Sequence, residues 1–521
     1  MSAGSREPLT LAKAAVRIAE DLDGVVDVSL PPDNPEGALS SALEVLSHSF
    51  VRSTLEDASK RLKQHAEPAL KIAKLAVSML KKSGGDRYAE GQASALRVMA
   101  VVHLSRLEVE KAGKAAVEAS KISQAAGDRM SEAATLRILS EISIGRAMRV
   151  TGGDRVDLEK LATNKLQELQ ELQQKHVEEA CEALKKVAAI MHEAEEWSQE
   201  ARAVLRIAEI WFTGGDAQEA CGFAREAASL FRLARDAKGE ADACELILNS
   251  VVALEGDSSV QALKAANNVV AVWKKAGNRR EQARALLLVM DVHKHAKNLQ
   301  ALLDTADEAV GLFGNARDYA GQACVHNRVL TMHLLLAAEE QEAIQTVAKE
   351  KMLGDDISAK KAPLEEKWTK AMQQGLQAAN RMLDASFNAS EKTLRAWALA
   401  NVAEVKLEMF FRPYEAVREE VRLFRASRGA RSNWESLMDQ VHMEEHEEAM
   451  RMLQEASEIF EKEGDEEGKV AVFGTMQRAD QRAAMAEHAS ETITIMDAES
   501  KEVLDVVQKW APREAQPALT A

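Results

Sequence analysis

The chain has 521 residues, of which 46% are hydrophobic and only 4% aromatic, and its formal net charge is −16. A chain this long exceeds one compact core, and its apolar content is too high for general disorder. The negative charge argues against nucleic-acid binding, because most of the surface would repel a polyanion. The 4 cysteines are widely spaced without a CxxC pair, which favours a reducing compartment over a disulfide framework.

The sequence shows neither the pattern of a secretory signal nor that of a membrane-spanning segment. Residues 1–30 mix Asp and Glu with apolar side chains and lack the basic and apolar regions of a secretory signal. No run of about 18 apolar residues is present, so we expect no membrane span. We therefore expect a cytoplasmic protein, with association to the cytoskeleton or a cilium left open.

Charge is unevenly distributed along the chain. Residues 51–130 hold 15 Lys and Arg against 9 Asp and Glu, whereas residues 435–505 hold 6 against 20. The first region could therefore meet an acidic surface and the second a basic one. The alternative is that both are ordinary solvated helix faces.

The N-terminal third is predicted to begin with a short helix in residues 1–39. Residues 40–150 then form a first block of helical hairpins, because the tripeptide Gly85-Asp86-Arg87 recurs 42 residues later as Gly127-Asp128-Arg129. Glycine suits the left-handed position after a helix, and aspartate can cap the helix that follows.

An insert follows at residues 151–176. Its segment Val156–Lys175 is rich in Leu, Gln and Glu and contains neither Gly nor Pro. This composition predicts a continuous helix that lengthens a hairpin into a projecting arm of the coiled-coil kind.

The clearest period lies in the second block, residues 177–352. The positions Glu200, Glu240, Glu281 and Gly321 are spaced by 40, 41 and 40 residues. One period reads as a first helix from Glu200 to Phe212, a Gly-Gly-Asp turn and a second helix from Ala217 to Ala237. Apolar residues recur on one face of the first helix, at Val204, Ile207, Ala208 and Trp211. Since neither helix could bury its face alone, the hairpins must stack.

The C-terminal part is predicted to contain a second helical insert, an acidic third block and a loose tail, at residues 353–384, 385–505 and 506–521. The insert opens at Gly354, uses Pro363 as a first-turn proline and runs as helix through Trp368. The predicted fold class is all-α, an α-solenoid, or superhelix, of stacked antiparallel hairpins with two inserts.

These features resemble the tetratricopeptide repeat. The shared elements are an aromatic residue late in the first helix (Trp211), a Gly/Asp turn ending at Asp216, small residues where the two helices cross, and the tripeptide Gly127-Asp128-Arg129 between repeats. The 40–42-residue length is similar to the longer variant of kinesin light chains and polarity adaptor proteins. The resemblance covers roughly residues 40–505, although the proline that usually ends the second helix is mostly missing. It implies a scaffold for protein–protein interaction.

Arginine recurs at one position of the first helix in five repeats, at Arg97, Arg137, Arg206, Arg328 and Arg395, while Ile247 and Leu288 replace it in the middle. The resemblance implies that this position faces a concave groove. We therefore predict that these arginines, together with Arg202, bind an acidic peptide or helix, since guanidinium groups match carboxylates. The alternative is that they pack on neighbouring helices and pair with nearby Glu141 or Glu209.

Catalytic signals are weak. His442-Met-Glu-Glu-His446 matches the order of one metalloprotease motif, but it lies in an acidic run without a third ligand, so we interpret the two histidines as accidental surface residues. The Thr-Gly-Gly-Asp turns at Thr151 and Thr213 lack the Lys of a phosphate-binding loop. We expect no catalytic, metal or cofactor-binding residues.

Three functional hypotheses result. The first is a non-catalytic scaffold or adaptor whose Arg-bearing groove holds an acidic or helical partner segment. The second is a structural component of a ciliary, cytoskeletal or other multi-subunit assembly, held by the arm Val156–Lys175 and by the charged ends. The third, a metal-dependent or regulatory subunit of an enzyme, rests on the His442–His446 match alone. Self-association is left open.

Overall fold

A computed structural model describes residues 3–23, 35–55, 59–83, 89–152, 163–349, 354–427 and 443–483. Every regular element in these ranges is an α-helix, as predicted. The chain divides into two compact units, Met1–Gly256 and Asp257–Ala521. Within the described ranges, no helix has the length and apolar character needed to cross a membrane.

The first unit begins with a bundle of four helices: α1 (Ala3–Asp23), α2 (Pro35–Leu55), α3 (Ser59–Ser83) and α4 (Ala89–Ser105). Helix α1 has 21 residues, which corrects the expectation of a short helix, and it packs on α2 and α3. It is long because a stripe of small and apolar residues, including Ala12, Ala15 and Ala19, is buried in the same core as Leu43 and Ala73.

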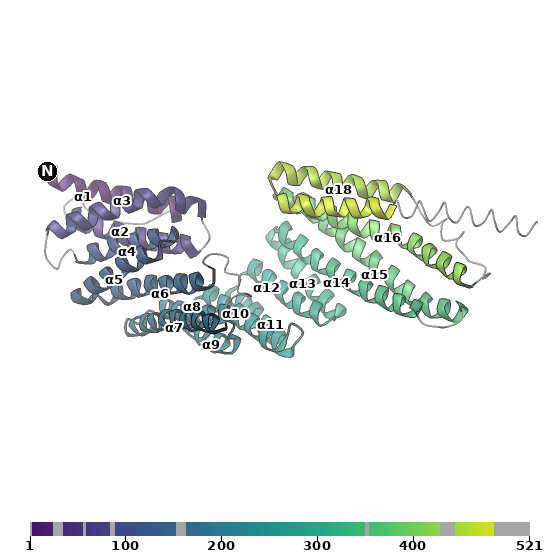
Figure 1. The fold of residues 1–521 in the computed structure, drawn as a ribbon, viewed down its shortest axis with the longest axis horizontal. Coiled ribbons are helices and arrows are strands. Elements are labelled where there is room, and N and C mark those ends of the chain that lie inside the picture. Colours follow the sequence, from purple (N-terminus) through teal and green to yellow (C-terminus); the bar gives the residue numbers. More distant parts are fainter. Residues whose placement is uncertain are drawn as a thin grey trace, which may run out of the picture. The chain divides into compact units, whose positions relative to one another are not determined.

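The rest of the first unit is a row of helical hairpins (Figure 1). Its helices are α5 (Val109–Ala126), α6 (Arg129–Gly152), α7 (Thr163–Glu193), α8 (Trp197–Thr213), α9 (Ala217–Ala234) and α10 (Ala237–Glu255). The pairs α4/α5, α6/α7 and α8/α9 are hairpins, and the second helix of each hairpin also packs on the first helix of the next. The predicted hairpin between residues 200 and 237 is confirmed, with its ends moved by three residues.

The second unit contains α11 (Val260–Ala276), α12 (Arg279–His295), α13 (Leu299–Ala316), α14 (Tyr319–Lys349), α15 (Gly354–Asn388), α16 (Lys392–Ser427), α18 (Met443–Glu463) and a further helical segment, 466–483. Helices α14 and α15 form a long hairpin around Trp368 and Met372. Pro363 lies inside α15 rather than in its first turn. The helix tolerates the lost hydrogen bond because its apolar face is held against α14.

Five of the joints between one hairpin and the next use the same local structure. The second helix ends in a left-handed residue, with φ between 54° and 73°, and the next residue is Asp or Asn. The side chain of that Asp or Asn accepts a hydrogen bond of 2.9–3.2 Å from the backbone N–H three positions on, which caps the following helix. The joints are Gly127-Asp128, Arg235-Asp236, Gly277-Asn278, Arg317-Asp318 and Gly464-Asp465. The capping role predicted for Gly127 and Asp128 is therefore confirmed.

A second recurring contact was not predicted. In three joints a phenylalanine near the end of one hairpin packs directly on a glycine eight positions later, near the start of the next. The pairs are Phe231–Gly239, Phe313–Gly321 and Phe460–Gly468, and a Cβ atom on each glycine would lie within 2.6 Å of the ring. The spacing of eight residues is a signal that the sequence already contained.

The two inserts fall on long helices. Helix α7 covers the second half of the first insert, and none of its residues from 167 to 179 is buried, whereas Ala180 is. Helix α15 covers the second insert. The boundaries predicted at 39/40, 150/151 and 384/385 fall inside α2, α6 and α15. Gly85-Asp86-Arg87, residues 153–162 of the first insert and the predicted tail 506–521 lie outside the described residues.

Candidate partner-binding site

Four of the recurrent arginines, Arg97, Arg137, Arg206 and Arg328, lie at the ninth or tenth residue of a first helix, whereas Arg395 lies at the fourth residue of α16. The surroundings of the arginines also differ. Arg97 on α4 is only 1% exposed. Its guanidinium donates to the Ser94 hydroxyl at 2.7 Å and to the hydroxyl and carbonyl of Ser131 on α6. Burial lowers the pKa of Arg97 from its ordinary value. Arg97 therefore links α4 to α6 inside the first unit and does not reach its surface.

Arg137 and Arg202 are neighbouring cations on two successive first helices, α6 and α8. Arg137 on α6 is half-buried and donates to the side-chain and backbone oxygens of Gln199 on α8, at 2.9 and 3.3 Å. Arg202 on α8 is well exposed, and its Nη2 lies 3.5 Å from Asp236, the residue that caps α10. Burial and the nearby charge of Arg202 both lower the pKa of Arg137. Arg137 therefore carries a positive charge that meets a neutral partner and a second cation.

Arg206 is enclosed by carboxylates. Its Nε and Nη2 donate to the two oxygens of Glu141 on α6 at 2.8 and 2.9 Å, and its Nη1 donates to Glu209 at 2.7 Å. Burial opposes the charged form, but the two carboxylates outweigh it and raise the pKa of Arg206 above its ordinary value. Both glutamates named as alternative partners are thus engaged, but Glu141 pairs with the arginine of the next hairpin rather than with Arg137.

The last two arginines also have acidic neighbours. Arg328 on α14 makes a two-pronged contact with Asp291 on α12, at 3.0–3.1 Å. Arg395 on α16 donates to Glu455 on α18 at 2.5 Å, and its guanidinium lies 4.4 Å from the ring centroid of Phe387. Arg206 and Arg328 therefore each tie one first helix to the first helix before it. Among the arginines of this set that reach the surface, the described residues give Arg137 no carboxylate partner, and the ion pair of Arg202 with Asp236 is the longest, at 3.5 Å.

No cluster of three or more His, Cys, Asp or Glu able to hold a metal occurs in the described part of the chain. His442 lies outside that part. His446 packs against Phe410 and Phe411, with ring centroids 5.2 and 5.9 Å apart. It is therefore a half-buried packing residue rather than the accidental surface histidine that we expected.

No protein-family model and no curated protein matches this chain. Three solved structures illustrate what it is similar to. Apo RapI has 10% identity and a TM-score of 0.38, with 83% of this chain and 99% of that one covered. A signal-transduction ATPase with a tetratricopeptide repeat sensor, from Pyrococcus horikoshii, has 12% sequence identity and a TM-score of 0.32. The match covers 96% of this chain and 65% of that one. Yeast Tom70 has 13% sequence identity and a TM-score of 0.22, with 88% of this chain and 97% of that one covered. Because these TM-scores are below 0.5, the helical-repeat architecture rests on the hairpins and joints described above.

Proposed function

We propose that this chain is a non-catalytic scaffold of the tetratricopeptide type, in the 40–42-residue kinesin-light-chain-like variant, that binds a protein partner. The partner segment is acidic, either extended or helical, and lies across the first helices of the hairpins on their concave side. The stacked hairpins support this proposal, because a row of rigid first helices presents side chains at regular intervals to one long segment.

The observation that carries the acidic character of the partner is the pair Arg137 and Arg202. A carboxylate placed between them would gain two charge-assisted hydrogen bonds and would remove the repulsion between the two guanidinium groups. Arg206, Arg328 and Arg395 contribute less, because a partner carboxylate would have to compete with the acidic residues that already hold them. Arg97 is buried and holds α4 to α6 beneath this surface, so it does not contact the partner.

The test is affinity capture from the source organism with three forms of the full chain: wild type, Arg202→Glu and the control Arg225→Glu. Arg225 is exposed on the second helix α9, so both variants change the net charge equally. We expect the same co-purifying protein with wild type and the control, and its loss with Arg202→Glu. Equal recovery with all three forms would refute the role of this surface.

A second candidate is a structural subunit of a larger assembly, held by the first half of α7. It is favoured by the absence of buried residues from 167 to 179. Replacing Leu169 and Leu172 with Gln would then release the chain from sedimenting complexes without changing capture through Arg202. Unchanged sedimentation would exclude this role for the arm.

A further inference from the structure

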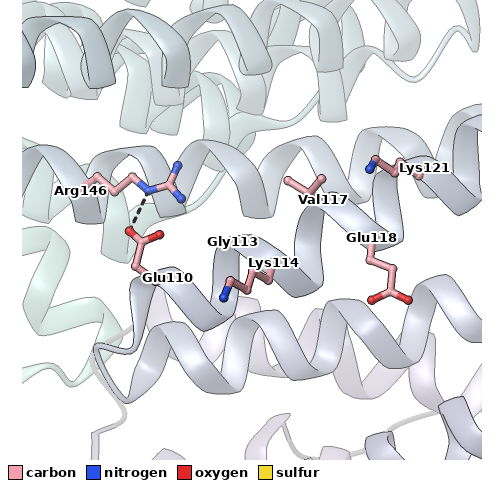
Figure 2. A pocket seen from close by; sticks show the side chains of 7 residues that line it. All are labelled: Glu110, Gly113, Lys114, Val117, Glu118, Lys121 and Arg146. Carbon is pink, nitrogen blue, oxygen red and sulfur yellow. Dashed lines mark ion pairs between the residues drawn. The ribbon is translucent and has the colours of Figure 1, made fainter.

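A shallow groove lies along α5 in the first unit and is not part of the arginine surface. It has a volume of about 470 Å³ and is lined by Glu110, Gly113, Lys114, Val117, Glu118 and Lys121 of α5 and by Arg146 of α6. Figure 2 shows Arg146 and Glu110 at one end, Lys121 and Glu118 at the other, and Val117 between them.

The first end of the groove is shaped by a glycine. A Cβ on Gly113 would lie 2.8 Å from Nη2 of Arg146, so the bare backbone of α5 leaves room for that guanidinium. Arg146 also lies 3.5 Å from Glu110. Its charge is therefore partly balanced, and this end of the groove is close to neutral.

The middle and the other end offer an apolar contact flanked by cations. Val117 is 45% exposed, although valine is usually buried. Lys114 and Lys121 are also exposed, and they precede and follow Val117 by three and four positions. This spacing places all three side chains on one stripe of the helix, with the two ammonium groups anchored about 10 Å apart along the axis. Glu118 lies beside this stripe and leaves the lining with one more cation than carboxylates.

We propose that this groove is a second docking surface, which binds an amphipathic acidic helix of a partner protein. Two carboxylates about two turns apart on the partner pair with Lys114 and Lys121, and an apolar side chain between them covers Val117. The argument is charge complementarity: the lining holds three cations against two carboxylates, and α5 lies within residues 51–130, where Lys and Arg outnumber Asp and Glu by 15 to 9. A helix fits because its side chains repeat with the same spacing as those of α5.

The probe is a fluorescein-labelled 16-residue peptide of Ala, Leu and Glu, with two Glu seven positions apart and one Leu midway between them. Binding to the full-length chain is measured by fluorescence anisotropy at low and moderate salt. The double variant Lys114→Glu with Lys121→Glu should weaken binding about ten-fold, since two exposed ion pairs become repulsive. The matched control is Lys264→Glu with Lys275→Glu on α11, where both lysines are exposed, and it should bind as the wild type does.

Val117→Thr removes one exposed methyl contact while keeping the shape of the side chain. It should weaken peptide binding about four-fold, and by the same factor at both salt concentrations, since one apolar carbon contributes about 0.8 kcal/mol. If the effect of Val117→Thr on peptide binding disappears at moderate salt, the peptide is held by general electrostatic attraction, and the proposal of helix docking at this site is overturned. Circular dichroism confirms that each variant keeps its helices.

Two further outcomes would also overturn the proposal. If Arg202→Glu abolishes peptide binding and the Lys114/Lys121 variant does not, the acidic helix binds the arginine surface alone, and only the proposed function stands. If the wild-type chain self-associates with rising concentration and the Lys114/Lys121 variant stays monomeric, the occupant of the groove is a second copy of this chain. If the Lys114/Lys121 variant loses peptide binding and Arg202→Glu retains it, the result supports the groove as an independent docking surface.

Discussion

The ring of Phe313 occupies the space that a side chain on Gly321 would need. A Cβ atom on Gly321 would lie 2.4 Å from two ring carbons of Phe313, which is buried completely. The same contact recurs between Phe231 and Gly239 and between Phe460 and Gly468. The distance between one hairpin and the next is therefore set at these joints by an aromatic ring lying on bare helix backbone.

Replacing Gly321 with Ala should destabilise the second unit. The added methyl group must displace a buried ring, and overpacking of this kind typically destabilises a protein by about 1–3 kcal/mol. Urea unfolding followed by circular dichroism measures the change. Gly311→Ala is the matched control, because Gly311 is also helical and has no atom within 4 Å of the new methyl group. That control should gain up to about 1 kcal/mol from helix propensity, and a similar gain in Gly321→Ala would contradict the steric account.

Arg206 and Glu141 should be energetically coupled. Their side chains are partly buried and joined by two parallel hydrogen bonds across successive hairpins. A double-mutant cycle with Arg206→Ala and Glu141→Ala should give a coupling energy of about 1 kcal/mol in urea unfolding. The pair Arg225→Ala and Glu141→Ala should be additive, and additivity in the first cycle would show that the contact does not stabilise the stack.

Stability of the second unit should fall as the pH is lowered. Burial lowers the pKa of His333 and, together with nearby Arg381, that of His326, so both side chains hold a proton less readily in the folded state than in the unfolded chain. Asp307 and Asp384 act on His326 in the opposite direction without reversing the shift. The histidines of the unfolded chain bind protons near pH 6.5, so the free energy of unfolding decreases as the pH falls below that value. The decrease levels off once the pH is below the pKa values of the folded state.

The measurement is the urea midpoint at pH 7.5 and at pH 5.5. The Nδ1 atom of His333 is buried without a hydrogen-bond partner, so His333→Leu should be tolerated at pH 7.5 and should reduce the difference between the two midpoints. If His333→Leu keeps the full difference between the urea midpoints at pH 7.5 and pH 5.5, the His333 side chain has no role in the pH dependence of stability.

The cysteine thiols should react slowly in the folded protein. Burial raises the pKa of Cys244 to about 11 and also raises the pKa values of Cys181 and Cys324. At pH 8 only about one in a thousand Cys244 side chains is then the reactive thiolate. A disulfide reagent should modify all 4 thiols at once in guanidinium chloride and none within seconds in native buffer. Rapid native labelling of Cys244 would contradict its burial.

Much of the fold was predictable because its determinants are local. The joint at Gly127 and Asp128 was identified from two adjacent residue types, one of which tolerates positive φ while the other accepts a hydrogen bond from the next helix. The length of α1 was underestimated, since its alanines carry little signal until the helices that cover them are known. The position of Pro363 was misjudged, because proline is favoured in the first turn of a helix, whereas α15 already begins at Gly354.

The sequence alone predicted an all-α fold, helical hairpins with a spacing of about 40 residues between the two inserts, and arginine recurring on their first helices. These properties follow from helix periodicity and turn chemistry, which act over a few residues. Only the tertiary structure decided what each arginine meets: serine for Arg97, glutamine for Arg137, two glutamates for Arg206. The partners from other hairpins lie 34 to 65 residues away along the chain. They are brought together by the stacking of hairpins, which depends on contacts such as Phe313 on Gly321 and not on local preference.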